Sequence, residues 1–565
     1  MRVRFPGDLR AAFARAVESW SAEHSTERLW RRDATLWTGS DEGRWLGWLD
    51  GPEREASRLG LYAELPRRAV QDGVRDVVLL GMGGSSLGAE LFRRSWQAAA
   101  GALRLHIVDS THPEQIESAT RAVDPRSTWV LVASKSGATL EPNLLLAAFF
   151  DRFERALGAA APRRFLAITD PGSALENLAR ERGFLALIPG EPTIGGRFSA
   201  ISPFGLAPAA FLGVDLARFV ERTASMAGRC RAVDVLDNPG VGLGLAIAVA
   251  AEQGRDKLTL IVAPGIEALG AWLEQLIAES TGKRGRMILP IDGEPAHPPE
   301  QYGRDRLFVV VRLGGALTEA GERRVAELVE AGQPLIELDC RTVDEIGGEL
   351  FRWEIATAAA GARLGVHPFD QPDVEAAKIA TRRLTAAVEA TGELPPETAF
   401  LAEAGLELHA DEANRAELLD AVDNPTIAGL LGAHFGRARS GDYIALLAFL
   451  EMSAENERAL AALRGRAATR SGIATTVGFG PRFLHSTGQA HKGGPPSGLF
   501  LQITERPVRD LPVPGRRLSF GQVLAAQARG DLEVLAERGR RHLRLHFPDG
   551  AAAGWQALEG AWSVE

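Results

Sequence analysis

The stretch from residue 128 to residue 142 has the sequence TWVLVASKSGATLEP. Its first half is a short, continuous apolar run, which is the pattern of a strand buried in a parallel sheet. Its second half holds Ser134, Ser136 and Thr139 around Lys135, one of only five lysines among 565 residues. Hydroxyls, backbone N–H groups and a lysine beyond the carboxyl end of a strand are donors suited to phosphate. The stretch therefore predicts an α/β sheet with an anion site at its edge.

The same pattern recurs along the chain, in short apolar runs separated by segments of helical length. A first group of predicted strands includes this stretch and four others: DVVLLGMGG (76–84), LRLHIVDS (103–110), RRFLAITDP (163–171) and GFLALIPG (183–190). A second group consists of KLTLIVAP (257–264), RLFVVVRL (306–313) and QPLIELDC (333–340), with IEALGAWLEQLIAES (266–280) as the clearest helix. Alternating strands and helices predict doubly wound parallel sheets.

We therefore predict an α/β protein in four parts. A helical N-terminal segment (1–65) precedes two α/β domains (66–225 and 226–385) and a C-terminal α/β extension (386–565). The extension has predicted strands at DYIALLAFL (442–450), GIATTVGFG (472–480) and GLFLQIT (498–504). Its segments AHKGGPPSG (490–498) and DLPVPGRR (510–517) are rich in Pro and Gly and are predicted loops.

Composition narrows the classes of function. A formal net charge of -9 argues against a nucleic-acid-binding surface, and the two cysteines form neither a metal-ligand spacing nor a disulfide framework. No apolar run approaches the roughly 18 residues of a membrane-spanning helix, and the first residues lack the apolar core of a signal peptide. These features predict a cytoplasmic protein that does not bind membranes.

A glycine loop, GMGGSSLG (81–88), follows the first predicted strand. Its glycines let the backbone approach an anion, and the next helix points N–H groups toward it. A nicotinamide-binding fold is the rival interpretation, because Asp109 ends the next strand in a position to hold a ribose. That fingerprint requires Gly or Ala where this chain has Ser86. The second, hydroxyl-rich loop favours a compact sugar phosphate.

Three further motifs carry candidate catalytic residues. EQLIAESTGK (274–283) places Gln275 and Glu279 four residues apart, on one face of a helix. GGRFSAIS (195–202) places Arg197 after two glycines. In HPFDQPDVEAAK (367–378), Gln371 precedes a proline suited to the first position of a helix, and Lys378 lies nearly two turns into that helix. Each of these residues taken singly is equally consistent with a surface charge or an ion pair.

Taken together and in this order, the five motifs resemble the phosphoglucose isomerase family. The resemblance covers roughly residues 30–385. The sequence is most similar to the isomerase half of bacterial transaldolase–isomerase fusions, and the transaldolase half is not in this chain. It implies two sugar-isomerase domains, a homodimer, and no metal or organic cofactor. It also implies reversible isomerisation of glucose 6-phosphate and fructose 6-phosphate in glycolysis and gluconeogenesis. The alternatives are a related isomerase that also accepts mannose 6-phosphate, and a non-catalytic sugar-phosphate sensor.

The resemblance assigns roles to residues one by one. Those implied to hold the substrate phosphate are Gly84, Ser85, Ser134, Lys135, Ser136 and Thr139. Glu279 matches the base that moves a proton between C1 and C2, and Arg197 matches the cation that stabilises the cis-enediolate. Lys378 matches a group for ring opening, and Gln275 and Gln371 match positioning residues.

The histidine that the family uses in ring opening is not found in its usual motif. His491, in HSTGQAHKGGPPSG (485–498), is the first candidate, because this segment resembles the family's histidine segments. His297 and His485 are the alternatives. His367 abuts Pro368 and is interpreted as structural.

Overall fold

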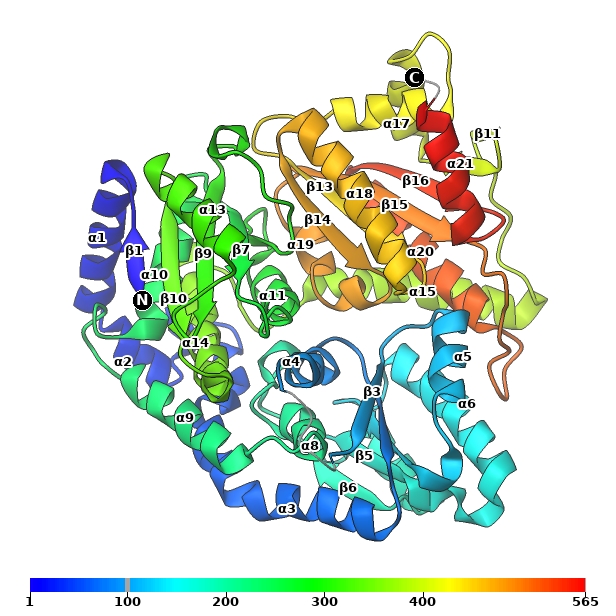
Figure 1. The fold of residues 1–565 in the computed structure, drawn as a ribbon, viewed down its shortest axis with the longest axis horizontal. Helices are drawn as coiled ribbons and strands as arrows, with labels where there is room; N and C mark the ends of the chain where they lie inside the picture. Colours follow the sequence, from blue (N-terminus) through cyan, green and yellow to red (C-terminus); the bar gives the residue numbers. More distant parts are fainter. Residues whose placement is uncertain (97–101, 564–565) are drawn as a thin grey trace. The chain divides into compact units, whose positions relative to one another are not determined.

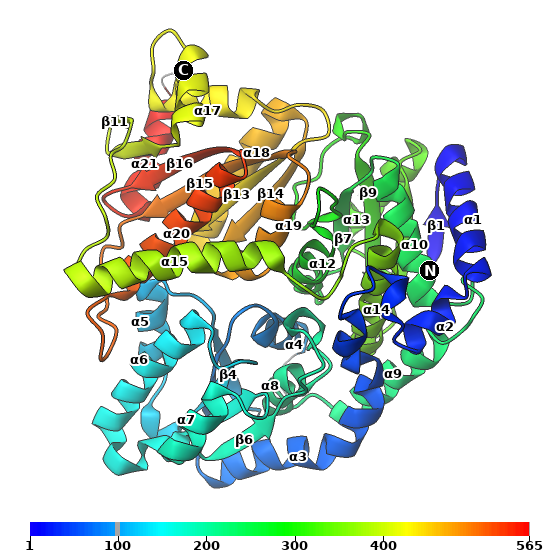
Figure 2. The ribbon, with the colours of Figure 1, turned by 180° about the vertical axis from the view of Figure 1, so that it is seen from behind.

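The computed structural model describes residues 1–96 and 102–563. The chain divides into two compact units, which are described separately (Figures 1 and 2). Unit 1 consists of Met1–Asp109, Arg121–Pro299 and Asp305–Asp370, and unit 2 of Ser110–Thr120, Glu300–Arg304 and Gln371–Glu565. Unit 1 contains all of the strands predicted before residue 386, and unit 2 contains the C-terminal strands.

The first sheet of unit 1 is parallel, with the strand order β3-β2-β4-β5-β6. Its strands are β2 (Asp76–Leu80), β3 (Arg104–Val108), β4 (Thr128–Ala133), β5 (Phe165–Thr169) and β6 (Ala186–Pro189). All residues of β2, β4 and β5 are buried, which explains why these strands have no polar alternation in the sequence. The helices that follow β2, β4 and β5 are α4 (Leu87–Ser95), α6 (Leu140–Leu157) and α7 (Ala174–Arg182).

The second sheet has the order β1-β10-β9-β7-β8. Its parallel strands are β7 (Lys257–Val262), β8 (Leu289–Ile291), β9 (Arg306–Leu313) and β10 (Leu335–Cys340). The edge strand β1 (Arg2–Arg4) runs antiparallel to β10. It lies in a segment predicted to be helical, so that expectation is wrong for these three residues. Alternation of strands with helices in both sheets confirms the predicted fold class.

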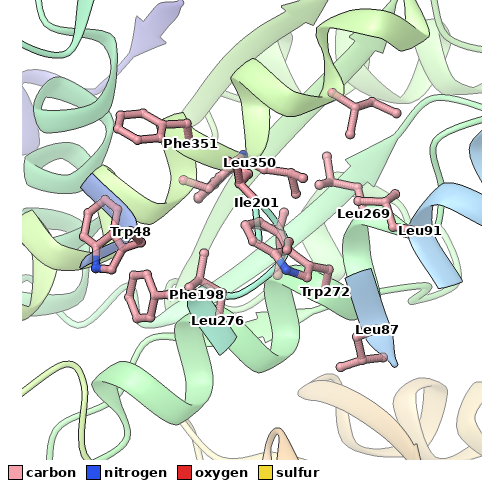
Figure 3. Close-up of a cluster of buried hydrophobic side chains, with 14 of the residues drawn as sticks. Trp48, Leu87, Leu91, Phe198, Ile201, Leu269, Trp272, Leu276, Leu350 and Phe351 are labelled. Carbon is pink, nitrogen blue, oxygen red and sulfur yellow. The ribbon is translucent and has the colours of Figure 1, made fainter. Parts of the chain in front are cut away.

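Long helices surround the two sheets of unit 1. The N-terminal helices are α1 (Gly7–Ala22), α2 (Ser25–Trp30) and α3 (Gly51–Gln71), and later ones are α8 (Pro203–Phe211), α9 (Leu216–Arg229), α10 (Pro239–Glu252), α13 (Glu319–Glu330) and α14 (Ile346–Leu364). Figure 3 shows part of the core between them. The Trp48 ring stacks on Phe198 at 5.1 Å between centroids and meets Phe351 edge-on at 5.9 Å. This packing fixes the backbone next to Arg197.

Unit 2 contains a mixed sheet with the order β11-β12-β16-β15-β13-β14. Four strands are parallel: β13 (Tyr443–Phe449), β14 (Ala474–Phe479), β15 (Gly498–Glu505) and β16 (Arg541–Phe547). Two antiparallel strands, β11 (Leu401–Glu403) and β12 (Leu406–His409), extend the sheet beyond β16. The sequence predicts β13, β14 and β15 but not the other three strands of this sheet.

Helices cover both faces of this sheet. One face carries α18 (Ala454–Ser471) and α21 (Ala551–Ser563), which lie in front of the strands in Figure 1. The other carries α15 (Pro372–Thr391) and α20 (Phe520–Glu537), which lie in front in Figure 2. The remaining helices include α16 (Glu412–Asp420), α17 (Ile427–Gly436) and α19 (Gly488–Gly493). Because α19 contains residues 490–493, the predicted loop at 490–498 is wrong over its first four residues.

None of the helices in the described residues is both long enough and apolar enough to span a membrane.

Candidate active site

Two glycine-containing loops of unit 1 are in direct contact. The glycine loop forms a short turn, η4 (Gly83–Ser85), and Arg197 lies in a second turn, η7 (Gly196–Phe198). A Cβ atom added to Gly84 would lie 2.0 Å from the carbonyl oxygen of Gly196, so only glycine permits this approach. Ser199 Oγ also donates a hydrogen bond of 3.2 Å to the Gly84 carbonyl. The glycine loop thus positions the arginine-bearing turn.

The hydroxyl loop curls between the end of β4 and the start of α6. Ser134 Oγ accepts a hydrogen bond from the Gly137 N–H, and Ser136 Oγ accepts one from the Ala138 N–H, each at 3.2 Å. Gly137 has a φ of +68°, a conformation that favours glycine. Thr139 is the residue before α6, and its side chain does not cap that helix. The first N–H groups of α6 therefore lie beside the loop, as an anion site requires.

Lys135 is held in place by protein groups. Its ammonium donates to the carboxylate of Asp170, and to the carbonyl oxygens of Glu191 and Pro192 at 3.1 Å each. These protein acceptors therefore compete with the predicted contact between the Lys135 ammonium and a phosphate. Its backbone N–H is the group that the geometry leaves for an anion.

A cavity of about 10 Å³ joins these loops. Its lining includes Ser85, Lys135, Gly196 and Ser199. This volume accommodates roughly one water molecule, so it is smaller than any sugar phosphate. Its lining nevertheless shows that the glycine loop, the hydroxyl loop and the arginine-bearing turn meet at one place in unit 1.

Glu279 lies where the helix after β7 changes its form. The predicted single helix consists of α11 (Leu269–Leu273), a π-helical turn (Glu274–Ala278) and α12 (Glu279–Thr281). The π turn includes Gln275, so the α-helical spacing assumed for Gln275 and Glu279 does not hold. Both residues are buried. Such single π turns occur frequently at functional sites.

Glu279 and Arg197 form a buried ion pair, with 3.1 Å between Glu279 Oε1 and Arg197 Nη1. Their side chains are only 9% and 2% exposed. Glu279 Oε2 is buried and has no hydrogen-bond partner among the described residues. Burial lowers the pKa of Arg197, and the Glu279 carboxylate opposes that shift. Within the described part of the chain, the site therefore contains one fixed guanidinium and one carboxylate oxygen without a hydrogen-bond partner.

The other donors of Arg197 fix its plane. Arg197 Nε donates to Ser280 Oγ at 2.8 Å, and Nη2 donates to the carbonyl oxygens of Pro368 and Asp370 at 2.8 and 2.7 Å. Arg197 thereby ties the end of the π-containing helix to the segment after α14. This arrangement holds the Nη1 atom against Glu279.

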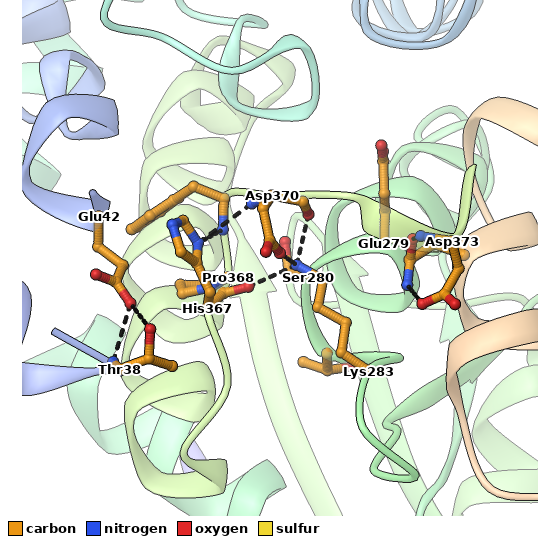
Figure 4. A network of polar contacts seen from close by, with 12 residues as sticks. Thr38, Glu42, Glu279, Ser280, Lys283, His367, Pro368, Asp370 and Asp373 are labelled. Atoms are coloured by element: carbon orange, nitrogen blue, oxygen red, sulfur yellow. Dashed lines mark hydrogen bonds and ion pairs between the residues drawn. The ribbon is translucent and has the colours of Figure 1, made fainter. Parts of the chain in front are cut away.

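A second buried cation, Lys283, binds the same segment (Figure 4). Its Nζ donates to the carbonyl oxygens of His367 and Asp370 at 2.5 Å each, and lies 2.7 Å from Asp370 Oδ1. Burial, together with the positive charge of Arg197, lowers the pKa of Lys283 to about 7. Neither Lys283 nor Asp370 was predicted as a site residue from the sequence, although lysine is scarce in this chain and each lysine is therefore a usable signal.

His367 has the structural position that was predicted for it. Its Nδ1 accepts the backbone N–H groups of Phe369 and Asp370 at 3.1 and 3.2 Å, so Nε2 carries the proton and donates to Asp41 Oδ1 at 2.8 Å. This hydrogen bond is the main cause of the lowered pKa of Asp41. Beside it, Glu42 accepts a hydrogen bond from the backbone N–H of Thr38 at 2.9 Å (Figure 4).

Three predicted site residues belong to unit 2. Gln371 is exposed and occupies the N-cap position of α15, directly before Pro372. Lys378 lies in the second turn of α15, with its side chain 41% exposed and its Nζ 3.6 Å from Glu375. The third, His491, lies in α19.

His491 is enclosed in the core of unit 2. Its ring stacks on Tyr443, whose hydroxyl lies 3.1 Å from His491 Nδ1, and meets Phe500 edge-on. Burial and then the charge of Lys492 hold the pKa of His491 well below its ordinary value, so the imidazole is neutral. A role in ring opening requires this ring to become accessible to substrate. His485 ends the turn η11 (Arg482–His485), and His297 lies in the loop between β8 and β9.

No group of three or more His, Cys, Asp or Glu side chains in the described ranges is arranged to hold a metal ion.

The parallel sheets of unit 1, with glycine-rich and hydroxyl-rich loops beyond the carboxyl ends of β2 and β4, define an α/β class of protein. A crystal structure of a glucose-6-phosphate isomerase from Chlamydia trachomatis superposes with a TM-score of 0.51 and 21% identity, covering 66% of this chain and 79% of that chain. The family model for phosphoglucose isomerase matches residues 67–288, which include Gly84, Ser134, Arg197 and Glu279.

Two sequence relatives agree with that match. A glucose-6-phosphate isomerase of Thermus thermophilus is 30% identical over 394 residues, covering 61% of this chain and 91% of the relative. One of Rubrobacter xylanophilus is 29% identical over 376 residues, covering 58% and 86%. The chain belongs to the phosphoglucose isomerase family.

Proposed function

We propose that this protein is a glucose-6-phosphate isomerase, which interconverts glucose 6-phosphate and fructose 6-phosphate. The observation that carries the proposal is the buried pair of Glu279 and Arg197, in which one carboxylate oxygen has no hydrogen-bond partner among the residues that the structure describes. Aldose–ketose isomerisation moves a proton between C1 and C2, so it needs a base that can take the proton and return it. Glu279 Oε2 is the group that we assign to both steps.

Arg197 has a distinct role in this mechanism. Removing the proton creates a cis-enediolate, whose negative charge is best stabilised by a cation that is already oriented. Arg197 meets that condition because Ser280, Pro368 and Asp370 fix its position before substrate binds. Its Nη1 contact with Glu279 also holds the base in place.

The loops beyond β2 and β4 would hold the phosphate. The hydroxyls of Ser85, Ser134, Ser136 and Thr139, with the backbone N–H groups of Gly84 and Lys135, are the proposed donors. Several charge-assisted hydrogen bonds at one end of the substrate would fix the position of C1 and C2 relative to Glu279.

Ring opening requires groups beyond this pair. We propose that Lys378 acts at the ring oxygen or the O1 hydroxyl, with Gln275 and Gln371 as positioning residues. The contributing histidine is His491, His485 or His297. We also propose that the enzyme works in the cytoplasm as a homodimer, in glycolysis and gluconeogenesis.

The direct test is an assay with fructose 6-phosphate, in which glucose 6-phosphate is detected by a coupled dehydrogenase. The proposal expects turnover and, in deuterated water, exchange of deuterium into the C1 position of fructose 6-phosphate. Exchange without net turnover would show that the proton is taken from C1 and returned there but is not delivered to C2. Absence of both reactions in folded protein would contradict the proposal, and conversion of mannose 6-phosphate instead would identify a different isomerase.

A further inference from the structure

Unit 2 contains a cavity of about 210 Å³ that plays no part in the mechanism above. It lies near the carboxyl ends of β13, β15 and β16, which contribute Phe449, Thr504 and His546 to its lining. The strand β13 has β14 on one side and β15 on the other, so the direction of winding changes between β13 and β15. In open α/β sheets, ligands bind beyond the carboxyl ends of strands at such a switch point.

The floor of the cavity is built by strand register. Glu407, His546, Thr504 and Phe449 are direct partners across four neighbouring strands, so they form one row on one face of the sheet. Because side chains alternate between faces, residues two positions away lie on that same face. His409 and Arg544 pair in this second row and also line the cavity. The walls come from α20 and from the segment around Glu397.

Charged side chains of both signs line the cavity: the guanidinium groups of Arg529 and Arg544, and the carboxylates of Glu397, Glu407 and Glu505. Glu397 Oε2 lies 2.5 Å from Arg544 Nη2 and 3.4 Å from Arg529 Nε, so one carboxylate serves two guanidinium groups. Glu505 is already engaged by His112 at 2.9 Å and by the Ala551 N–H at 2.7 Å. Arg544 is buried, with its side chain only 5% exposed.

Donors remain available after these contacts. Arg529 uses Nη1 on the Pro395 carbonyl at 2.7 Å, and Arg544 uses Nη2 on Glu397. His546 uses Nδ1 on Thr504 Oγ1 at 2.9 Å. None of the hydrogen bonds in the described ranges uses Arg529 Nη2, Arg544 Nη1 or His546 Nε2. Burial, followed by the charge of Arg544, lowers the pKa of His546 to about 4, so this ring is neutral at pH 7.

We propose that this cavity binds a small hydroxy acid. Its carboxylate is held by Arg529 and Arg544, and its hydroxyls donate to Glu397 and Glu407 and accept from His546. A volume of about 210 Å³ is below the roughly 300–1,000 Å³ that drug-sized ligands occupy, which suits a metabolite of a few carbon atoms. Phe449 and Leu524 supply an apolar side for its carbon chain.

The test uses calorimetry on the full chain with two matched pairs of probes. Glycerate is compared with glycerol, and gluconate with sorbitol, so that each acid has an uncharged partner of similar shape. We expect saturable binding of at least one acid and none of its uncharged partner. In proton NMR spectra, binding should shift the ring-proton resonances of the His546 imidazole. Those resonances are identified by their absence from the spectrum of a His546→Gln variant.

Two variants test whether the acid binds in this cavity of unit 2. Arg529→Gln, whose side chain is 17% exposed, should weaken binding of the acid at least tenfold without lowering the unfolding temperature or the isomerase activity. The pair Ser134→Ala with Thr139→Ala should leave binding unchanged, because those residues lie in the phosphate loop. Absence of saturable binding by both acids would overturn the proposal. Binding that survives Arg529→Gln but is lost in the double variant would also overturn it and place the acid in unit 1.

Discussion

Arg197 Nη1 lies 3.1 Å from Glu279 Oε1, and both side chains are almost fully excluded from solvent. Burying two charges carries a large desolvation penalty, which the attraction between them offsets only when hydrogen bonds satisfy their remaining polar atoms. Arg197 has four acceptors, whereas Glu279 Oε2 has none among the described residues. This difference indicates that the Glu279 carboxylate, rather than the Arg197 guanidinium, is the reacting group.

Replacing Glu279 with glutamine should lower kcat by roughly 10²–10⁴-fold, because general acid–base groups contribute about that much. The amide retains the shape and an acceptor for Arg197, so phosphate inhibition should change little. The matched control is Glu319→Gln, whose carboxylate is 91% exposed and should not affect activity. Retention of more than about a tenth of kcat by Glu279→Gln would show that another group is the base.

Removing two hydroxyls from the loop that we propose holds the phosphate should raise KM. For Ser134→Ala with Thr139→Ala, each lost hydrogen bond to a charged group is worth roughly 1.5–3 kcal/mol. Inhibition by free phosphate should weaken in parallel, since the sugar is not involved. Steady-state kinetics with and without inorganic phosphate measure both effects. Unchanged phosphate inhibition in the double variant would remove this loop from the site.

The histidine of ring opening can be identified by comparing two reactions. If His491 is that group, His491→Asn should slow turnover of the cyclic sugar far more than proton exchange on an open-chain substrate. Its ring packs against Tyr443 and Phe500, so thermal unfolding must be measured on the same preparation. Equal losses in the two reactions would transfer the role to His485 or His297, whose Asn variants are assayed in the same way.

Lys283 should make stability depend on pH on the alkaline side. Its pKa is about 7 in the folded chain and ordinarily 10.5, so between these values the unfolded chain binds a proton that the folded chain does not. Stability contributed at this site therefore rises with pH from about 7 to 10.5, by up to about 1.4 kcal/mol per pH unit, and is lost as pH falls through 7. Denaturant unfolding at pH 7 and 9 should show this rise in the wild type relative to Lys283→Met. Parallel changes in the two proteins would contradict the lowered pKa.

Glu354 should make the stability of the fold depend on pH in the opposite direction to Lys283. It lies fully buried in α14, and neither carboxylate oxygen has a hydrogen-bond partner in the described part of the chain. Burial raises its pKa well above 4.5, so its contribution to stability is complete below pH 4.5 and declines as pH rises toward the folded pKa. Glu354→Gln removes that decline. Its stability relative to wild type should therefore increase by up to about 1.4 kcal/mol per pH unit above pH 4.5. A constant difference between pH 4.5 and pH 8 would show that Glu354 is ionised in the fold.

The strands predicted from the sequence contain apolar runs, whereas the missed strands are short or rich in polar residues. Strands such as β4 are continuous apolar runs, because helices cover both sides of the sheet. By contrast, β16 (RHLRLHF) was missed because its polar side chains, among them Arg544 and His546, face a cavity on one side. The short strands β1 and β8 have three residues each and depend on their partners rather than on their own pattern.

The sequence could predict only those residues of the candidate site whose side chains carry the chemistry. Glu279 and Arg197 were selected through motifs, and their ion pair agrees with that selection. The contacts that orient them were not predictable, because the carbonyl oxygens of Pro368 and Asp370 belong to the backbone and leave no signature in residue type. The contact of Lys135 with Asp170 joins residues 35 positions apart and likewise required the fold.

The segment Ser110–Thr120 belongs to unit 2, although nearly all of that unit follows residue 370. His112 reaches Glu505 across 393 positions of the chain, and Thr111 donates to Gln527 across 416. Contacts of such long range form slowly, because a large loop must close before they stabilise the structure. During synthesis on the ribosome, this segment must wait for nearly the whole chain to emerge. A fragment that begins at residue 371 would leave the buried Glu505 carboxylate without its histidine, so the C-terminal unit should fold poorly when expressed alone.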